Sequence, residues 1–321
     1  MIAQVKNTSS LIRYEQLRKV DSNSDMSVLQ KRAKSKYITL RLMKKMCALN
    51  SPLARGYQKT CACATVIDQK DGKMTSRYCG NRWCSVCNRI RSAQCISKYE
   101  PILKTWNDTQ FVTLTVVNVE AKELLNTLTA MNANFRRVLD LMRKRKIPIK
   151  GIRKVEITYN ESQNTYHPHF HVLVEGQHAA NILHDEWLRL NPTSKAIAQR
   201  VMGVDCDDVD VFKEMFKYLT KLFDKDKQGK YKEVNPKALD IIFRVMKGRR
   251  TMQPFGFKAP ILEEEGAIEL TENTEAPSSE VKTWIWCETD WFDIETGEAL
   301  ANFRITRKIK RMLAETGLDE T

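Results

Sequence analysis

The sequence predicts an α+β protein in which helices flank a central antiparallel sheet and a small metal-binding module precedes it. Two strand-like runs, residues 151–159 and 166–174, are separated by a short polar loop, which favours antiparallel neighbours. The second run holds three of the protein's five histidines, His167, His169 and His171, at alternating positions. Five of the cysteines lie between residues 61 and 87, upstream of these strands.

Composition and charge limit the classes of protein to which the chain can belong. With 321 residues, of which 42% are hydrophobic, the chain is long enough for more than one globular domain. The net charge is +14, but residues 1–258 hold 47 lysines and arginines against 24 acidic residues, whereas residues 259–321 are acidic. A basic field of this size favours a polyanionic partner, most commonly nucleic acid, and the alternative is a basic surface that is only solvated.

The sequence also indicates a compartment. No apolar run approaches the length of a membrane span, and the first residues lack the apolar segment of a secretory signal. The nine cysteines are an odd number, which argues against a disulfide framework. We therefore expect a cytoplasmic protein without a membrane partner.

The N-terminal segment begins polar and becomes basic and amphipathic at about residue 28. Leucine, isoleucine and methionine alternate with lysine and arginine over residues 28–49, which predicts one or two helices with a basic face. This face could lie on DNA or be solvated, and the sequence leaves both possibilities open.

The cysteine-rich segment has the spacing of a structural zinc site. Cys61 and Cys63 precede a predicted hairpin, and Cys79, Cys84 and Cys87 follow it. Four thiolates can close a tetrahedral shell around zinc, so we expect the last three cysteines and either Cys63 or Cys61 as ligands. A redox C-x-x-C motif is the alternative, but the surrounding βαβ pattern is missing.

Arginines surround this module and continue into the helix predicted over residues 88–106. We expect Arg82, Arg89 and Arg91 to contact phosphate groups of DNA.

The histidine run is the candidate metal site of the sheet. Side chains alternate along a strand, so His167, His169 and His171 share one face. Pro168 lacks an amide donor and belongs at the start or edge of a strand, which places His169 and His171 in the regular ladder. Pairing with the preceding strand would put Glu156 beside them as a third, oxygen ligand. The alternative is a strand whose histidines only face solvent.

The remaining elements follow from periodicity and turn signals. The run at residues 110–117 predicts a strand and that at 120–145 a helix. Further helices are predicted over residues 178–190, 211–223 and 236–250, a short strand within 201–211, an acidic flexible linker over 263–279, and a hairpin plus helix over 282–313.

One of these helices, residues 211–223, carries a candidate nucleophile. Glu214, Tyr218 and Lys221 are spaced i, i+4 and i+7, so all three project from one side of the helix beside its apolar stripe. The alternative is an amphipathic tyrosine that is packed and paired with a surface carboxylate.

The order of the motifs resembles a known superfamily. Phe111-Val112-Thr113-Leu114-Thr115, then His169-Phe170-His171, then Tyr218-x-x-Lys221 resemble the three motifs of the His-hydrophobe-His endonucleases. Within that superfamily, the cysteine run at residues 79–89 and the glutamate before the tyrosine look like rolling-circle replication initiators of small bacterial plasmids. The resemblance implies a ferredoxin-like or RRM-like antiparallel sheet with a metal on one face and the catalytic helix across it.

The resemblance also implies a mechanism. Tyr218 would attack a phosphate of single-stranded DNA, leaving a 5′-phosphotyrosyl link and a 3′-OH primer. His169, His171 and Glu156 would hold Mg²⁺ or Mn²⁺, although two imidazoles by themselves would tolerate Zn²⁺ or Mn²⁺ better than Mg²⁺. Lys221 would neutralise phosphate or lower the pKa of the tyrosine, and Glu214 would activate the water or hydroxyl that ends the reaction.

The implied partners are origin DNA, single-stranded or as a hairpin at the nick site, together with a host helicase and polymerase. On this reading the chain divides into a basic helical segment (1–55), a zinc-binding module (56–100), an endonuclease domain (101–258), an acidic linker (259–281) and a small C-terminal segment (282–321). Two rival functions are a relaxase or single-strand transposase and a non-catalytic, zinc-containing DNA-binding regulator.

Overall fold

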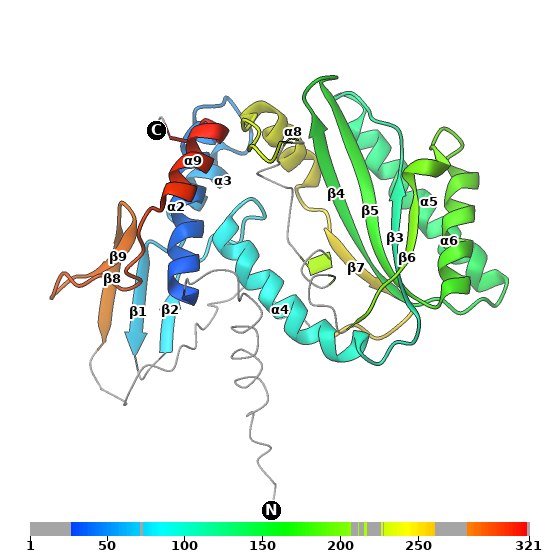
Figure 1. The fold of residues 1–321 in the computed structure, drawn as a ribbon, viewed down its shortest axis with the longest axis horizontal. Helices are drawn as coiled ribbons and strands as arrows, with labels where there is room; N and C mark the ends of the chain where they lie inside the picture. Colours follow the sequence, from blue (N-terminus) through cyan, green and yellow to red (C-terminus); the bar gives the residue numbers. More distant parts are fainter. Residues whose placement is uncertain are drawn as a thin grey trace, which may run out of the picture. The chain divides into compact units, whose positions relative to one another are not determined.

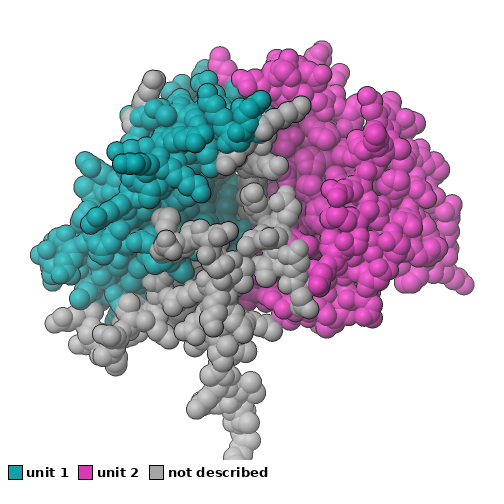
Figure 2. Space-filling view, viewed as in Figure 1, with its two compact units in different colours: residues 1–93, 223–236, 263–321 teal, residues 94–222, 237–262 magenta. Residues whose placement is uncertain are grey.

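The chain forms two compact units, coloured teal and magenta in Figure 2. Unit 1 comprises residues 1–93, 223–236 and 263–321, and unit 2 comprises residues 94–222 and 237–262. The structure is a computed structural model that describes residues 27–70, 73–206, 211, 215–216, 226, 228–260 and 281–319. Its antiparallel sheets flanked by helices confirm the predicted α+β class. No helix within the described ranges is both long and apolar enough to cross a bilayer.

Unit 2 is built on a five-stranded antiparallel sheet with strand order β6-β3-β5-β4-β7. The three central strands coincide with the runs predicted from β-branched and aromatic residues. The edge strand β7 was not predicted, because it has only four residues and one of them is a proline. The strands are β3 (Thr109–Thr115), β4 (Gly151–Asn160), β5 (Thr165–Glu175), β6 (Arg200–Gly203) and β7 (Met252–Phe255).

Two helices cover one face of this sheet. α5 (Leu124–Lys144) and α6 (Gln177–Leu190) run side by side in Figure 1 and contact β5 and β3. The buried residues of α5 recur every three or four positions, as an amphipathic helix on a sheet requires. Phe135 of α5 and Phe170 of β5 also hold the guanidinium of the buried Arg153 between them, 4.7 and 4.5 Å from the two ring centroids.

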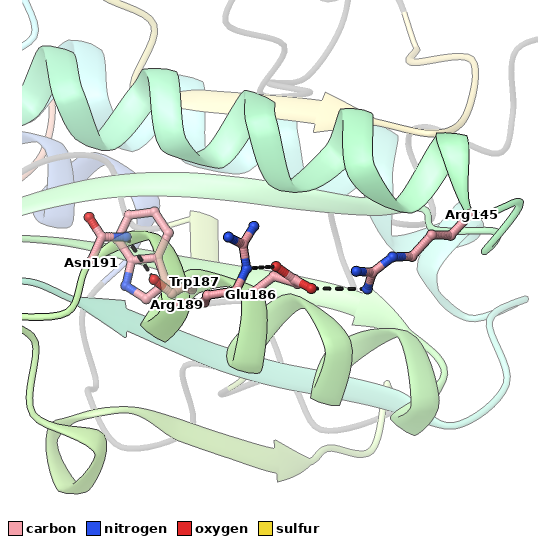
Figure 3. A network of polar contacts seen from close by, with 5 residues as sticks. All are labelled: Arg145, Glu186, Trp187, Arg189 and Asn191. Carbon is pink, nitrogen blue, oxygen red and sulfur yellow. Dashed lines mark hydrogen bonds and ion pairs between the residues drawn. The ribbon is translucent and has the colours of Figure 1, made fainter.

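An ion pair connects α6 to Arg145, the residue that follows α5, as Figure 3 shows. Glu186 of α6 accepts from Arg145 at 2.9 Å and from Arg189 at 2.5 Å, and its side chain is only 10% exposed. The neighbouring Trp187 donates from Nε1 to the carbonyl oxygen of Thr115 at 3.0 Å. The helical layer is therefore fixed to the end of β3, one strand away from the histidine run.

The opposite face of the sheet, which we call the histidine face, carries His169, His171, Glu156 and their neighbours. Apolar residues close one end of it, where Ile152 and Leu173 pack in a buried cluster with residues of α4 (Ser85–Leu103) and with Met215 and Phe216. The ring of Phe216 stacks on Tyr99 of α4 with centroids 5.4 Å apart. The polar centre of the face therefore lies next to a well-packed apolar border.

Strand register explains how β5 accommodates a proline. β3 pairs with β5 only as far as Thr115, which lies opposite His169, so Pro168 lies beyond the end of that ladder. β4 continues further and pairs with His167 and Pro168. His169 and His171 thus have strand neighbours on both sides whereas His167 has β4 alone, as expected from the position of the proline.

Unit 1 joins segments from both ends of the chain in one four-stranded antiparallel sheet, ordered β2-β1-β8-β9. β1 (Val66–Lys70) and β2 (Lys73–Ser76) form the hairpin predicted between the cysteine clusters. β8 (Lys282–Cys287) and β9 (Asp290–Asp293) form the hairpin predicted for the tail. β8 pairs with β1, so the C-terminal hairpin completes the sheet that begins in the cysteine-rich segment.

Three helices complete the described part of unit 1: α2 (Val28–Cys47), α3 (Ala54–Cys61) and α9 (Arg307–Thr316). α2 begins with a capping box, in which the side chains of Ser27 and Gln30 each accept from the other's backbone amide. Thr306 caps the start of α9, and Gly317, whose φ of 66° favours glycine, caps its end. The helix over residues 28–49 was predicted, whereas α3 was not. The described part of unit 2 also contains α8 (Pro236–Met246), as predicted.

Candidate metal centres

Four cysteines converge in unit 1. The sulfur of Cys63 lies 3.6 Å from those of Cys84 and Cys87, and the sulfur of Cys79 lies 3.7 Å from that of Cys87. A zinc ion that binds four sulfurs at about 2.3 Å with tetrahedral angles would separate them by about 3.8 Å. The four thiols therefore fit the shell of a zinc ion closely.

Backbone amides point at two of these sulfurs. Cys79 donates its N–H to the sulfur of Cys63, and Asn81 donates its N–H to the sulfur of Cys79, both at 3.4 Å. Such donors stabilise the negative charge of a thiolate and fix the orientation of the cysteine side chain. The cluster has the closed shell of a structural site.

Side chains inside the cysteine run hold its backbone in place. Asn81 donates from Nδ2 to Gly56 O and Thr60 Oγ1, and Trp83 donates from Nε1 to the same hydroxyl, all at 2.9 Å. Thr60 is completely buried. Sequence reasoning missed these three supporting side chains, although Asn81 and Trp83 lie between the cysteines that it selected.

Cys61, the alternative fourth ligand, lies outside the cluster. Burial, together with the nearby Cys47, raises the pKa of the Cys61 thiol to about 11. The geometry thus groups Cys63, rather than Cys61, with the three downstream cysteines.

The three arginines expected to contact DNA have different surroundings. Arg91 donates to backbone carbonyls of the cysteine run and to Asn88 Oδ1, so its guanidinium supports the fold of the module. Arg82 is half-buried, and Arg89 is exposed on α4. Of the three, Arg89 is therefore best exposed for contact with a polyanion.

In unit 2, the sheet brings together Glu156, His169 and His171. Register places Glu156 of β4 opposite His169 of β5, and one ligand atom from each of the three residues lies within 4.8 Å of the others. Glu156 Oε2 is 3.6 Å from His171 Nε2. The side chains of Glu156 and His171 are only 6% and 14% exposed, so the cluster is shielded from bulk water.

Hydrogen bonds orient the two imidazoles. Nδ1 of His169 lies 3.1 Å from the carbonyl oxygen of His167. Because a carbonyl can only accept, Nδ1 carries the proton and Nε2 keeps a lone pair for a metal. On the other side, Nδ1 of His171 lies 3.5 Å from Thr113 Oγ1. Thr113 belongs to the motif at residues 111–115, so this motif supports the His169-Phe170-His171 motif.

The charges of the cluster suit a cation. Burial, and then the proximity of His171, lowers the pKa of His169 to about 4, so this imidazole is neutral at pH 7. Burial alone would raise the pKa of Glu156, but Lys154, His169 and His171 together hold it below its usual value. A neutral imidazole beside an ionised carboxylate is a donor set that can bind a divalent metal ion.

Lys154 is a further member of this site that the sequence did not single out. Its ammonium lies 3.2 Å from Glu156 Oε2, and the two side chains are 7% and 6% exposed. Register places it opposite His171. Its buried positive charge therefore lies beside the metal-binding group.

Replacing Lys154 with methionine should destabilise the metal-free protein by about 3 to 5 kcal/mol, because Glu156 keeps a buried charge without this partner. Mn²⁺ should restore part of the loss, since it can neutralise the same carboxylate. Thermal unfolding with and without Mn²⁺ measures both effects, and the Mn²⁺-induced rise in Tm should be larger in the variant than in the wild type.

Lys150→Met is the matched control, because Lys150 pairs with Glu175 at 2.6 Å but the two side chains are 33% and 25% exposed. Loss of a pair at the surface costs about 1 kcal/mol or less. If Mn²⁺ raised the Tm of the wild type and of Lys154→Met equally, Lys154 and the metal ion would not both neutralise Glu156.

The proposed catalytic helix is only partly described. Val211, Met215 and Phe216 are helical, and the last two are completely buried. Both contribute to the apolar stripe predicted for this helix. Glu214, Tyr218 and Lys221 lie outside the described residues.

Comparison with known proteins gives one family match. A family model described as "Replication protein" matches residues 73–275, more than half of the chain. No solved structure matches the chain.

Several curated relatives are named "Protein rep". One from Streptococcus pneumoniae serotype 2 is 34% identical over 117 residues, covering 34% of this chain and 37% of that protein. One from Staphylococcus aureus is 38% identical over 118 residues, covering 34% and 49%, and one from a Bacillus species is 30% identical over 133 residues, covering 38% and 43%. The chain thus matches less than half the length of each of these relatives.

Proposed function

This chain belongs to the replication protein family, and from that premise we propose that it initiates rolling-circle replication of a plasmid by nicking one strand of origin DNA. The observation that carries the proposal is the buried group of Glu156, His169 and His171 on a sheet face. Family membership supports a role in replication, and this group of residues supports metal-assisted activation of a phosphate.

The proposed metal is Mg²⁺ or Mn²⁺, held by one carboxylate and two imidazoles. A metal ion held by Glu156, His169 and His171 would polarise the scissile phosphate and offset the charge of the transition state. Glu156 and His169 supply an ionised and a neutral ligand at pH 7, which requires no proton release from either group.

The proposed nucleophile is Tyr218. Its phenol oxygen forms a bond to phosphorus and the bond from phosphorus to the 3′-oxygen breaks. The phenol loses its proton, and the departing oxygen gains one to become the 3′-OH primer. Lys221 would neutralise the phosphate or lower the pKa of the tyrosine, which is otherwise about 10.

Phe216 is the described residue that lies nearest to Tyr218 in the sequence. This residue packs in one cluster with Ile152 and Leu173, which belong to the histidine face. Tyr218 follows it by two residues in the sequence. Glu214, four residues before the tyrosine, would activate the water or hydroxyl that releases the covalent intermediate.

We further propose that the four-cysteine cluster holds a structural zinc ion and that unit 1 contributes to DNA binding. The sulfur separations match a tetrahedral zinc shell. Arg82, Arg89 and Arg91 would place positive charge beside the module, with Arg89 the most exposed. A host polymerase would extend the 3′-OH primer, and a host helicase would separate the strands.

Conversion of supercoiled origin plasmid to nicked circles tests the function. His169→Ala and His171→Ala should each lower the Mn²⁺-dependent nicking rate by about 100-fold or more, because metal assistance contributes several kcal/mol to such a transition state. Mn²⁺ binding, measured by calorimetry on the same proteins, should weaken in parallel.

His178→Ala is the matched control, since His178 is an exposed histidine of α6 in the same unit. This variant should nick at the wild-type rate. Nicking by the wild type that persists in excess chelator would overturn the metal-assisted mechanism. Nicking at the wild-type rate by both His169→Ala and His171→Ala would overturn it as well.

A further inference from the structure

A buried lysine lies next to the four-cysteine cluster. Lys36 belongs to α2 in the basic N-terminal segment and is only 1% exposed. Lysine is almost never fully buried unless its charge is compensated, because removing an ammonium from water is costly. Its position therefore requires a partner of negative charge or several strong acceptors.

The contacts of Lys36 place its ammonium on the cysteine-rich segment. Nζ donates to the carbonyl oxygens of Cys61, at 2.9 Å, and of Cys63, and it lies 3.2 Å from Thr65 Oγ1. The same nitrogen lies 5.9 Å from the ring centroid of Trp286 in β8. Residues from the N-terminal helix and the C-terminal hairpin thus meet at the backbone of one cysteine ligand.

The positive charge of Lys36 can balance the negative charge of a metal-thiolate group. A zinc ion bound by four thiolates carries a net charge of −2, and three of the four cysteines here are buried. Negative charge in a buried site is destabilising unless a cation or hydrogen bonds offset it. Burial lowers the pKa of Lys36, and the nearby thiol groups of Cys63, Cys84, Cys61 and Cys79 oppose that shift.

We propose that Lys36 is a positioning residue of the zinc centre, whose fixed positive charge offsets the charge of the metal-thiolate group and slows the release of zinc. The inference rests on the zinc site proposed above and goes beyond it, because Lys36 precedes the region that matches the family model. It assigns part of the metal centre to the N-terminal helix, whose basic residues would otherwise suggest DNA contact or solvation.

A simpler role would be to satisfy backbone carbonyls. α3 ends at Cys61, and a lysine near a helix C-terminus is favourable without any metal. In that case, the substitution Lys36→Met would lower the stability of unit 1 but leave the rate of zinc release unchanged. The two roles therefore predict different results.

The experiment compares zinc release from the full-length chain in the wild type, Lys36→Met, Lys36→Arg and Lys44→Met. Lys44 is an exposed lysine of the same helix and provides the matched control. Each protein is purified with zinc, its metal content is measured, and release to excess 4-(2-pyridylazo)resorcinol is followed by absorbance. In the protein with Co²⁺ in place of zinc, the thiolate-to-metal charge-transfer bands show whether the cysteines bind the metal.

Lys36→Met should release zinc about 10- to 100-fold faster than the wild type, as expected when an outer-shell partner is lost. Lys36→Arg and Lys44→Met should stay within about threefold of the wild type. If Lys36→Met is not recovered in a folded form, refolding of Lys36→Arg is measured instead. Refolding of this variant at the same zinc concentration as the wild type supports the role of charge.

Three results would overturn the inference. Equal release rates in wild type and Lys36→Met would leave Lys36 with only its carbonyl contacts. Equally fast release from Lys36→Met and Lys36→Arg, or failure of both to fold at saturating zinc, would mean that shape and not charge matters. A wild-type protein without zinc would instead overturn the proposed zinc centre itself.

Discussion

Tyr218→Phe is expected to abolish the covalent link between protein and DNA and to lower nicking by a thousandfold or more. Phenylalanine keeps the aromatic ring and removes only the oxygen that would bond to phosphorus. When a nucleophile is removed, the remaining metal and binding groups sustain only a small residual rate. Denaturing gel electrophoresis of protein incubated with origin oligonucleotide labelled at its 3′ end and Mn²⁺ measures the adduct directly, because the tyrosine stays joined to the fragment that carries this label.

Tyr159→Phe is the matched control for this substitution. Tyr159 lies at the end of β4 in unit 2, and its hydroxyl donates to Asn164 Oδ1 at 2.8 Å, away from any proposed chemistry. This variant should form the adduct at the wild-type rate. If Tyr218→Phe still formed the adduct, the nucleophile would be a side chain other than Tyr218.

Glu214→Ala separates the two halves of the proposed reaction. If Glu214 activates the water or hydroxyl of the closing step, the variant should still form the adduct and should accumulate it, because release is slowed. An equal loss of adduct formation and release would place Glu214 in the first step and remove its proposed role in termination.

The local pattern predicted the elements that have strong periodicity. The alternation of residues in β5 and the helical spacing in α5 each extend over ten or more residues, and both elements were predicted close to their observed bounds. By contrast, α3 has eight residues and β7 has four, too short for a period to stand out. Pairing of β1 with β8 joins residues more than 200 positions apart, and no local signal encodes it.

The candidate sites divide in the same way. Glu156 was found because a short polar loop sets the pairing of β4 with β5, so its distance to the histidines follows from local sequence. Lys154 lies on the same strand and face, but lysines usually point to solvent, and its burial depends on tertiary packing that local sequence does not encode. Lys36 reaches the cysteine cluster through the packing of α2, which sequence spacing does not indicate.

Removal of zinc should unfold the cysteine-rich part of unit 1 and leave the sheet of unit 2 intact. Zinc binding contributes roughly 10 to 16 kcal/mol in small zinc-finger peptides, where binding and folding are one process. Here Cys63, Cys79, Cys84 and Cys87 would join the segment after α3, the end of the β1–β2 hairpin and the start of α4 through one metal ion. Hydrogen exchange after chelation should therefore show loss of protection over residues 60–90, with β3, β4 and β5 unchanged.

Substitution of single cysteines tests which thiols bind the zinc ion. Cys63→Ser and Cys84→Ser should each lose the zinc ion on dialysis, whereas Cys61→Ser should keep one zinc per chain. The comparison is informative because Cys61 and Cys63 are chemically identical, are separated by one residue and both precede the region matched by the family model. Only the positions of their sulfurs distinguish them, so zinc retained by Cys63→Ser and lost by Cys61→Ser would show that the fourth ligand is assigned to the wrong thiol.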